Sequence, residues 1–198
     1  MDFLYGNPKS PLHFQKPHEF AIAVILSAQC TDERVNQVTP VLFQELDSLE
    51  KIANVKLSKL EKLIYSTGFY KNKSKNIKAF AKIILEKYDG KLPRTLEELE
   101  ALPGIGRKTA NVVLSELYGI ESGVVVDTHV RRLSNRLGFV ETENVLHIEE
   151  KLKTIVPQKD WRKFSLQLIF HGRRMCMARN PNCSACELQK LCPSFPIQ

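Results

Sequence analysis

The sequence of 198 residues has no long hydrophobic segment. Its longest apolar run, at residues 20–26, is far shorter than the roughly 20 residues that an α-helix needs to cross a bilayer. The first residues also lack the basic stretch followed by an apolar one that is typical of a secretory signal. We therefore expect a protein located inside the cell, without membrane contact, in which residues 20–26 form a buried core helix.

Acidic residues are absent from two stretches of the chain. No Asp or Glu lies between Glu61 and Glu86 or between Asp160 and Glu187, and we call these stretches the first and second basic windows. The two windows hold 11 of the 29 Lys and Arg residues, so the other 18 basic residues face 22 acidic ones. The net charge of +7 is therefore local, which predicts a polyanionic partner. A lysine-rich face that only contacts solvent is the alternative interpretation.

The alternating pattern of half-buried β-strands is also missing, whereas apolar residues recur every three to four positions. The sequence predicts an all-α protein, a compact array of helices divided near residue 120. Capping boxes at Ser58–Glu61 and Thr95–Glu98 should open short helices, and Gly68 and Gly90 should lie where helices end. Further helices are predicted at residues 18–29, 32–46, 74–88, 107–118, 128–137, 145–155 and 161–175.

Five cysteines are present, but the expected reducing location argues against a disulfide framework. Four of them, Cys176, Cys183, Cys186 and Cys192, form a C-x6-C-x2-C-x5-C array that predicts a metal centre. Zinc and an iron–sulfur cluster both accept four thiolates. The single C-x2-C pair favours iron–sulfur, because zinc ribbons usually have two such pairs. Arg179 lies between the first two ligands, so the metal is expected to shape a basic loop.

Residues 102–110, LPGIGRKTA, form a glycine-containing turn before a predicted helix. Gly104 and Gly106 let the backbone turn sharply and approach a ligand closely. The amides at the start of the following helix would lie at the positive end of its dipole, where a phosphate is well accommodated. This arrangement is typical of a helix-hairpin-helix element that binds a nucleic-acid backbone without reading its sequence. An ordinary Pro-Gly-x-Gly turn is the alternative.

Two residues near this turn are candidates for catalysis. An ordinary surface lysine has a pKa of about 10.4, but a helix N-terminus and partial burial would both disfavour the charge on Lys108 and suit a nucleophile. A phosphate-binding lysine is the alternative. Asp127 follows the apolar residues 124–126 at a predicted helix N-cap. A carboxylate there could also stabilise positive charge on a sugar during cleavage of a glycosidic bond.

Three ordered motifs together resemble the endonuclease III family: residues 102–114 (LPGIGRKTANVVL), residues 126–131 (VDTHVR) and the cysteine array. The likeness extends from about Asn7 to Cys192. This family consists of bifunctional DNA glycosylases of the helix-hairpin-helix superfamily. The resemblance implies a helical barrel domain at residues 10–120, a domain formed by residues 1–9 and 121–198 that carries a [4Fe–4S] cluster on the four tail cysteines, and a DNA groove between the domains.

The resemblance also assigns roles to single residues. Lys108 falls on the family's nucleophile and Asp127 on its essential carboxylate. Gln29 falls on the glutamine that fills the gap left by a flipped base, and Phe69 on the residue that wedges between base steps, where a leucine is often found. The structural alternatives are a polar helix-end residue for Gln29 and a core aromatic for Phe69. Ala23 replaces the acid of the adenine-removing branch, which argues against that branch.

The implied function is removal of oxidised pyrimidines from double-stranded DNA, followed by β-elimination at the abasic site through a lysine Schiff base. The implied enzyme is a monomer, cytoplasmic and nucleoid-associated if it is bacterial. Two alternatives are a monofunctional thymine or uracil glycosylase of the same fold and a non-catalytic DNA-binding module with a zinc-stabilised tail.

Overall fold

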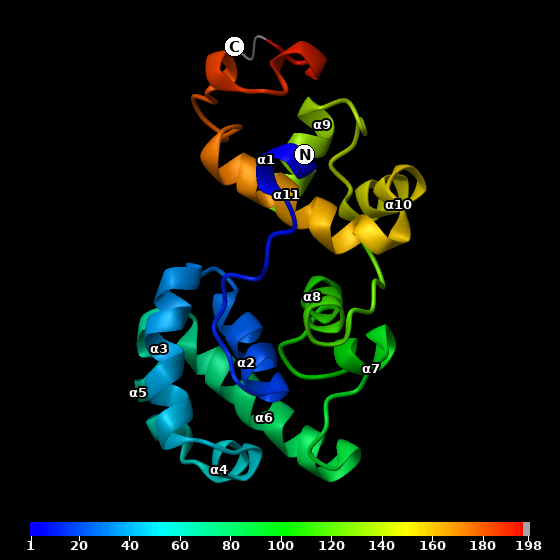
Figure 1. Ribbon diagram of the computed structural model, residues 1–198. Helices are drawn as coiled ribbons and strands as arrows, with labels where there is room; N and C mark the ends of the chain where they lie inside the picture. The colour runs from blue at the N-terminus through cyan, green and yellow to red at the C-terminus, as the bar shows by residue number, and fades with distance from the viewer. Residues whose placement is uncertain (196–198) are drawn as a thin grey trace. The chain divides into compact units, whose positions relative to one another are not determined.

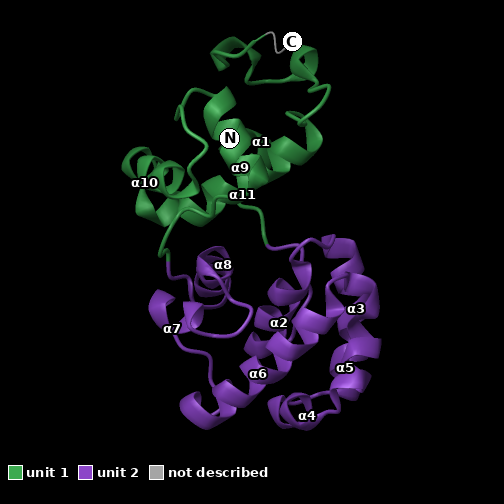
Figure 2. Ribbon diagram, turned by 180° about the vertical axis from the view of Figure 1, so that it is seen from behind, with its two compact units in different colours: residues 1–9, 121–198 green, residues 10–120 purple. Residues whose placement is uncertain are grey.

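The computed structural model describes residues 1–195, and within that range the chain is helical with no β-strand (Figure 1). The prediction of an all-α fold is confirmed. The chain divides into two compact units, shown in Figure 2: unit 1 is Met1–Lys9 with Glu121–Gln198, and unit 2 is Ser10–Ile120. None of the helices in the described part has the length and apolar character that spanning a membrane would require.

Unit 2 is built around helix α2 (Pro17–Ser27), whose residues are buried from Glu19 to Leu26. This segment is hydrophobic on all sides, so burial is the environment that suits it. The other elements of the unit are α3 (Asp32–Glu45), α4 (Leu49–Asn54), α5 (Leu57–Ile64), the 3-10 turn η1 (Tyr65–Thr67), α6 (Tyr70–Tyr88), α7 (Leu96–Glu100) and α8 (Arg107–Tyr118).

Unit 1 combines the start of the chain with its second half. Its elements are α1 (Asp2–Tyr5), α9 (Thr128–Arg136), α10 (Val145–Ile155), α11 (Trp161–Arg174) and the 3-10 turns η2 (Gln158–Asp160), η3 (Cys183–Ala185) and η4 (Gln189–Leu191). The Asp2 carboxylate accepts hydrogen bonds from Lys163 Nζ at 2.9 Å and Gln167 Nε2 at 2.7 Å. These bonds attach the first helix of the chain to α11.

All seven helices predicted by range are present, and the helices at residues 107–118 and 145–155 have the predicted bounds. Thr95 caps α7 as predicted, because its Oγ1 accepts a bond from the Glu98 amide at 3.4 Å. The capping box at Ser58 is wrong: α5 begins at Leu57 after the N-cap Lys56, so Ser58 lies inside the helix.

Two further differences concern helix starts. The helix predicted at residues 74–88 begins at Tyr70, because Phe69 takes a left-handed conformation with φ 47° and serves as its N-cap. Helix α4 was missed. It is capped by Ser48 Oγ, which accepts from the Lys51 amide at 3.3 Å. Six residues are too few for an amphipathic period to show in the sequence.

Candidate active site and metal centre

The glycine turn joins α7 to α8, as the sequence predicts. Gly104 has φ +81°, and a Cβ at this position would lie 3.1 Å from Asn76 Cβ and 3.3 Å from Ile25 Cγ2. The positive φ favours glycine here, and these neighbours leave little room for a side chain. Gly106 differs: it is the N-cap of α8 with φ −96°, and a Cβ there would meet nothing within 4 Å. Its lack of a side chain leaves room for a ligand.

The N-cap Gly106 has no side chain, so it makes no side-chain cap bond to the first turn of α8. This end of the helix is the positive end of its dipole, which suits an anion. The geometry fits the predicted phosphate-binding hairpin.

Lys108 is the second residue of α8, and its side chain is exposed within unit 2. The expectation of partial burial is wrong in this unit. The reason is helical geometry: α8 buries the face that carries Ala110, Val113 and Leu114, and Lys108 lies on the opposite face. The amine therefore points away from the core, beside the hairpin.

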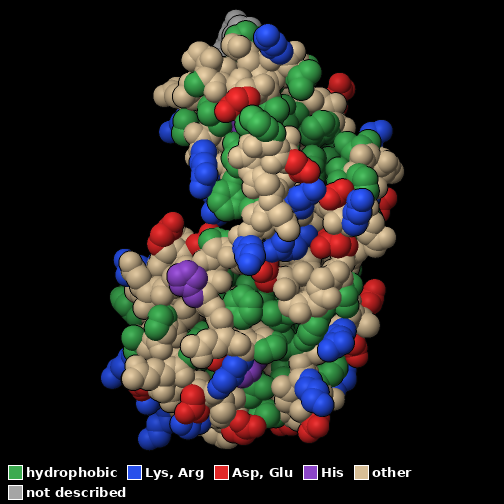
Figure 3. Space-filling model, in the orientation of Figure 1, with side chains coloured by type: hydrophobic (Ala, Val, Ile, Leu, Met, Phe, Trp, Pro, Cys, Tyr) green, Lys and Arg blue, Asp and Glu red, His purple; other side chains and the backbone are tan. Residues whose placement is uncertain are grey.

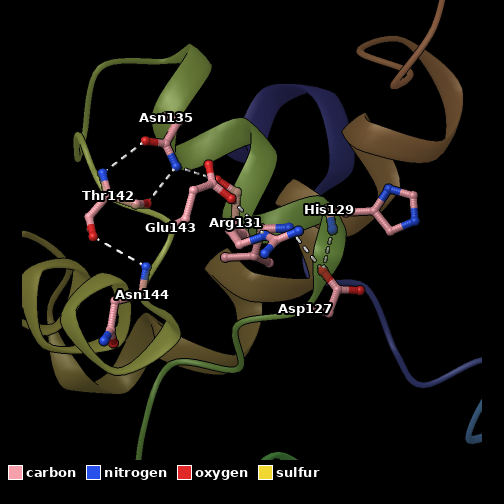
Figure 4. A network of polar contacts seen from close by, with 8 residues as sticks. Asp127, His129, Arg131, Asn135, Thr142, Glu143 and Asn144 are labelled. Atoms are coloured by element: carbon pink, nitrogen blue, oxygen red, sulfur yellow. Dashed lines mark hydrogen bonds and ion pairs between the residues drawn. The ribbon is translucent and has the colours of Figure 1, made fainter.

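Asp127 occupies the predicted N-cap of α9. Its Oδ1 accepts hydrogen bonds from the amides of His129 and Val130, each at 2.8 Å. Figure 4 shows the second carboxylate oxygen turned away from the helix backbone. The cap fixes the orientation of the carboxylate through one oxygen and leaves the other for a different partner.

Arg132, one turn along α9, connects this cap to the first tail cysteine. Its Nη2 donates to Gly172 O at 3.0 Å and to Cys176 O at 2.8 Å, and it lies 3.2 Å from His129 Nδ1. Burial lowers the pKa of His129. The sequence analysis missed Arg132, which lies one position beyond the motif at residues 126–131.

Gly172 makes the close approach around Arg132 possible. A Cβ at this position would lie 2.9 Å from His129 Nδ1 and 3.0 Å from Arg132 Nη2. Because α9 and α11 meet here, only glycine fits without moving these side chains.

The far end of α9 is held by a separate polar network (Figure 4). Asn135 Nδ2 donates to the carbonyls of Arg131 and Thr142 at 3.0 and 2.9 Å, and its Oδ1 accepts from the Thr142 amide at 3.1 Å. The Arg131 side chain pairs with Glu143 at 3.3 Å. These bonds fix the loop between α9 and α10, so α9 is restrained at both ends.

The four tail cysteines line one cavity with about 350 Å³ of empty space, part of which opens to solvent. The thiols are not joined in disulfides. Within residues 1–195, no three His, Cys, Asp or Glu side chains are close enough together to hold a single metal ion. Four cysteine thiols that line one cavity are a donor set that an iron–sulfur cluster accepts.

Polar groups surround these thiols. Arg136 Nη1 donates to Cys176 Sγ at 3.4 Å, and His171 Nε2 lies 3.6 Å from Cys186 Sγ. The other ring nitrogen of His171 is 2.8 Å from the Tyr5 hydroxyl. Donors of this kind stabilise the negative charge of thiolate ligands.

Arg179 lies exposed in the loop between Cys176 and Cys183. The loop is held by Arg136, which donates to the carbonyls of Met177 at 2.7 Å and Ala178 at 3.1 Å. The Asn182 amide closes the loop by donating a hydrogen bond to Met175 O at 2.9 Å. The backbone is thus fixed without using the Arg179 side chain, which is available to a ligand.

Gln29 and Phe69 both lie at exposed turns of unit 2. Gln29 follows the end of α2 with φ 52°, and Phe69 precedes α6 with φ 47°. The Phe69 side chain is 62% exposed, so the alternative of a core aromatic is wrong. The sequence analysis missed Tyr65, which is 65% exposed and packs against Tyr70 with ring centroids 4.8 Å apart.

The basic windows are less uniform than their composition suggests. Lys73 is 5% exposed and donates to backbone carbonyls, and Lys78 Nζ donates to Val55 O at 2.6 Å. Lys163 in the second window pairs with Asp2 and Asp160, each at 2.9 Å. On the face seen in Figure 3, basic side chains lie among acidic ones. Part of the basic charge is therefore structural, and the polyanion-binding role rests on the remaining residues.

Two family models match the chain. The HhH-GPD superfamily base excision DNA repair protein model covers residues 22–158, and the iron-sulfur binding domain of endonuclease III covers residues 176–192. Endonuclease III of Synechocystis sp. is 50% identical, covering 96% of this chain and 87% of that protein. Endonuclease III of Bacillus subtilis is 45% identical, covering 96% and 86%. Endonuclease III of Escherichia coli K12 is 40% identical, covering 94% and 88%.

Solved structures are similar over the same length. A trapped endonuclease III–DNA covalent intermediate has a TM-score of 0.92 and 42% identity, covering 97% of this chain and 90% of that one. A non-covalent endonuclease III–DNA complex gives the same values. A thermostable thymine-DNA glycosylase has a TM-score of 0.84 and 25% identity, covering 96% and 89%.

Proposed function

The chain belongs to the endonuclease III family, and from this premise we propose how its own residues carry out base excision repair. It is a bifunctional DNA glycosylase and abasic-site lyase, its partner is DNA, and its cofactor is a [4Fe–4S] cluster. Its substrate is double-stranded DNA with an oxidised pyrimidine or an abasic site, bound by a monomer. In a bacterium it works in the cytoplasm on the nucleoid, where that substrate lies.

The family also decides between the alternatives that the sequence left open. The chain is 42% identical to endonuclease III structures and 25% identical to the thymine-DNA glycosylase structure. A monofunctional thymine glycosylase and a non-catalytic binding module are therefore set aside.

Lys108 is the proposed nucleophile, supported by its exposed amine at the start of α8 beside the hairpin. The neutral amine attacks C1′ of the damaged nucleotide, and the base leaves with the electrons of the glycosidic bond and takes up a proton. The sugar ring then opens as the C1′–O4′ bond breaks and O4′ is protonated, which leaves a protonated Schiff base on Nζ. This iminium makes the C2′ proton acidic. Its loss expels the 3′ phosphate, and the strand is cut.

Asp127 is the proposed partner in this reaction. Its Oδ1 is fixed by two amides at 2.8 Å, which leaves Oδ2 to face positive charge that develops on the sugar. The same carboxylate assists removal of a proton from the attacking amine. A carboxylate in this role stabilises an oxocarbenium-like transition state.

The DNA contacts are assigned to elements of both units. The amides at Gly104 and Gly106 bind a backbone phosphate, and exposed Arg179 binds another. Extrusion of a base costs a few kcal/mol. Phe69 enters the stack as a wedge and Gln29 fills the vacated position, which together offset this cost.

The cluster has a structural role in this proposal. The thiolates of Cys176, Cys183, Cys186 and Cys192 hold it, and it supplies a rigid crosslink that shapes the loop at residues 177–182. Measurement of iron and sulfide in the purified protein tests this assignment. Zinc without iron or sulfide would contradict it.

The nucleophile is tested by borohydride reduction in the presence of abasic DNA. The wild type should form a covalent protein–DNA complex, because the Schiff base is reduced to a stable amine. Lys108→Arg should bind DNA but give no covalent complex, since a guanidinium does not form this bond. Lys91→Arg, at an exposed lysine of the same unit, is the matched control and should react as the wild type does. A normal yield from Lys108→Arg would refute the assignment.

The carboxylate is tested by Asp127→Asn, because Asn caps a helix as well as Asp does. The variant should keep its thermal stability and its affinity for abasic DNA but lose base excision by a factor of 100 or more, on the order of 3 kcal/mol of transition-state stabilisation. Excision within threefold of the wild-type rate would show that Asp127 is only a cap.

A further inference from the structure

Lys73 is a buried lysine whose ammonium group donates hydrogen bonds within unit 2. It lies in the first turn of α6 and is 5% exposed. Its Nζ donates to the carbonyl oxygens of Leu26 at 2.7 Å and Thr67 at 2.8 Å. Burial of an ammonium is costly unless it is hydrogen-bonded, and burial lowers the pKa of Lys73. The two carbonyls therefore stabilise the buried ammonium group. The same hydrogen bonds restrain the backbone at Leu26 and Thr67.

The two carbonyls belong to the two turns that carry Gln29 and Phe69. Leu26 lies in the last turn of α2, three residues before Gln29. Thr67 ends the 3-10 turn η1, two residues before Phe69. These turns are 40 positions apart in sequence, and one ammonium group joins them.

Both turns depend on an unfavourable backbone conformation. Gln29 has φ 52° and Phe69 has φ 47°, a region that residues with a Cβ rarely adopt. Such conformations persist only where the surrounding structure determines them. Since both residues are exposed, their side chains do not supply that support. The bonds from Lys73 to the preceding backbone are therefore well placed to do so.

The same part of α6 also supports the hairpin. Asn76, one turn beyond Lys73, lies against Gly104, and Ile25, next to Leu26, lies against the same glycine. The start of α6 thus contacts the hairpin and, through Lys73, both turns. All of these contacts lie within unit 2.

We propose that Lys73 is a positioning residue that sets the spacing between Gln29 and Phe69, so that wedge and gap-filling residue act on the same base pair of the duplex. The inference rests on the DNA roles assigned to these two residues under the proposed function. Lys73 does not contact the reacting atoms. Its effect should appear only where a base pair must be opened.

The test compares abasic-site cleavage on two substrates, a duplex and a single strand with the same abasic site. A single strand needs neither wedge nor gap-filling residue, so its cleavage reports folded, chemically competent enzyme. Lys73→Met keeps the aliphatic chain and removes the donors. It should lower the duplex-to-single-strand rate ratio at least tenfold. Lys87→Met, at an exposed position of the same helix but outside the first basic window, is the control and should leave the ratio within twofold of the wild type.

A purely structural role for Lys73 would lower both rates by the same factor, because fewer molecules would be folded. A wild-type ratio for Lys73→Met would therefore overturn the inference. If that variant does not fold, Lys73→Arg replaces it. The longer guanidinium keeps the charge but spaces its donors differently, so it should also lower the ratio, and an unchanged ratio would overturn the inference.

Failure of the proposed function is distinguished by a variant that combines Gln29→Ala with Phe69→Ala. If this variant keeps the wild-type ratio, the DNA roles of the two residues are wrong, whatever Lys73 does. If it lowers the ratio and Lys73→Met does not, only the positioning role fails. Adding Lys73→Met to this variant should lower the ratio by less than a further twofold, because Lys73 acts through the two residues already removed.

Discussion

In the described part of the chain, unit 2 has 28 buried core hydrophobic residues among its 111 residues, whereas unit 1 has nine among 84. Burial of apolar surface is the main favourable contribution to folding. Unit 2 therefore resembles an ordinary helical domain whose core alone supports it. The core of unit 1 is small for its size, so other interactions must contribute more to its stability.

Unit 1 compensates with polar bonds between distant segments and with its metal centre. Gln167 Nε2 donates to Gly6 O at 2.7 Å, and Arg132 and Arg136 donate to carbonyls of residues 172–178. The four cysteines proposed as cluster ligands line one cavity in this unit. The proposed nucleophile Lys108 therefore lies on the unit that its own core supports, and the proposed carboxylate Asp127 lies on the unit that depends on these polar bonds and the cluster.

Loss of the cluster should have the largest effect on stability of all these changes. The effect should be confined to unit 1. When the iron is removed with a chelator and an oxidant, amide hydrogen exchange should become fast at residues 176–192 and in the last turn of α11, because metal binding contributes directly to folding. Exchange in α2 and α6 should not change. Equal loss of protection in both units would show that the core of unit 2 does not support it alone.

Single core substitutions should sharpen the same contrast. Leu168→Ala in unit 1 and Phe80→Ala in unit 2 each remove a fully buried side chain, at a cost of about 2–5 kcal/mol. Because nine residues form the core of unit 1, Leu168→Ala should release iron, seen as loss of the visible absorption of the cluster. Phe80→Ala should lower the unfolding midpoint but keep the iron. Iron retention by Leu168→Ala would contradict the inference that unit 1 is only marginally stable.

Removal of the side chain that caps α9 should have a smaller effect on stability. Asp127→Ala removes the acceptor of two amide bonds and should lower the free energy of unfolding by about 1 kcal/mol. Chemical denaturation of this variant and of Asp127→Asn distinguishes the contribution of the cap from that of the negative charge, because Asn caps a helix without carrying a charge. If the Ala variant is as stable as the Asn variant, the cap does not stabilise unit 1.

The smallest effect concerns pH in unit 2. Burial lowers the pKa of His18 below its ordinary value, so the folded state holds a neutral ring where the unfolded state is protonated more readily. This contribution to stability is full above about pH 6.5 and is lost as the pH falls from there toward the folded-state pKa. His18→Asn should make the unfolding free energy of unit 2 less dependent on pH between 7 and 5. An unchanged pH dependence in this variant would contradict the prediction.

Local patterns made much of the site predictable. The Cys spacing, the glycine turn before α8 and the acid before α9 each lie within a few residues of the feature that they predict, so helix geometry and capping rules apply to them directly. The same rules failed at Ser58, because Leu57 and Lys56 allow α5 to start earlier. They also failed for the exposure of Lys108, which depends on the face of α8 that packs against unit 2.

By itself, the sequence determined the all-α class and the candidate residues, which are the four tail cysteines, Lys108 and Asp127, because each depends on neighbours along the chain. Only the tertiary structure decided that Lys73 joins the turns of Gln29 and Phe69 and that Arg132 connects the Asp127 cap to Cys176. Lys73 and Leu26 are 47 positions apart, and Arg132 and Cys176 are 44 positions apart. Contacts over such separations arise when helices pack, so no local pattern encodes them.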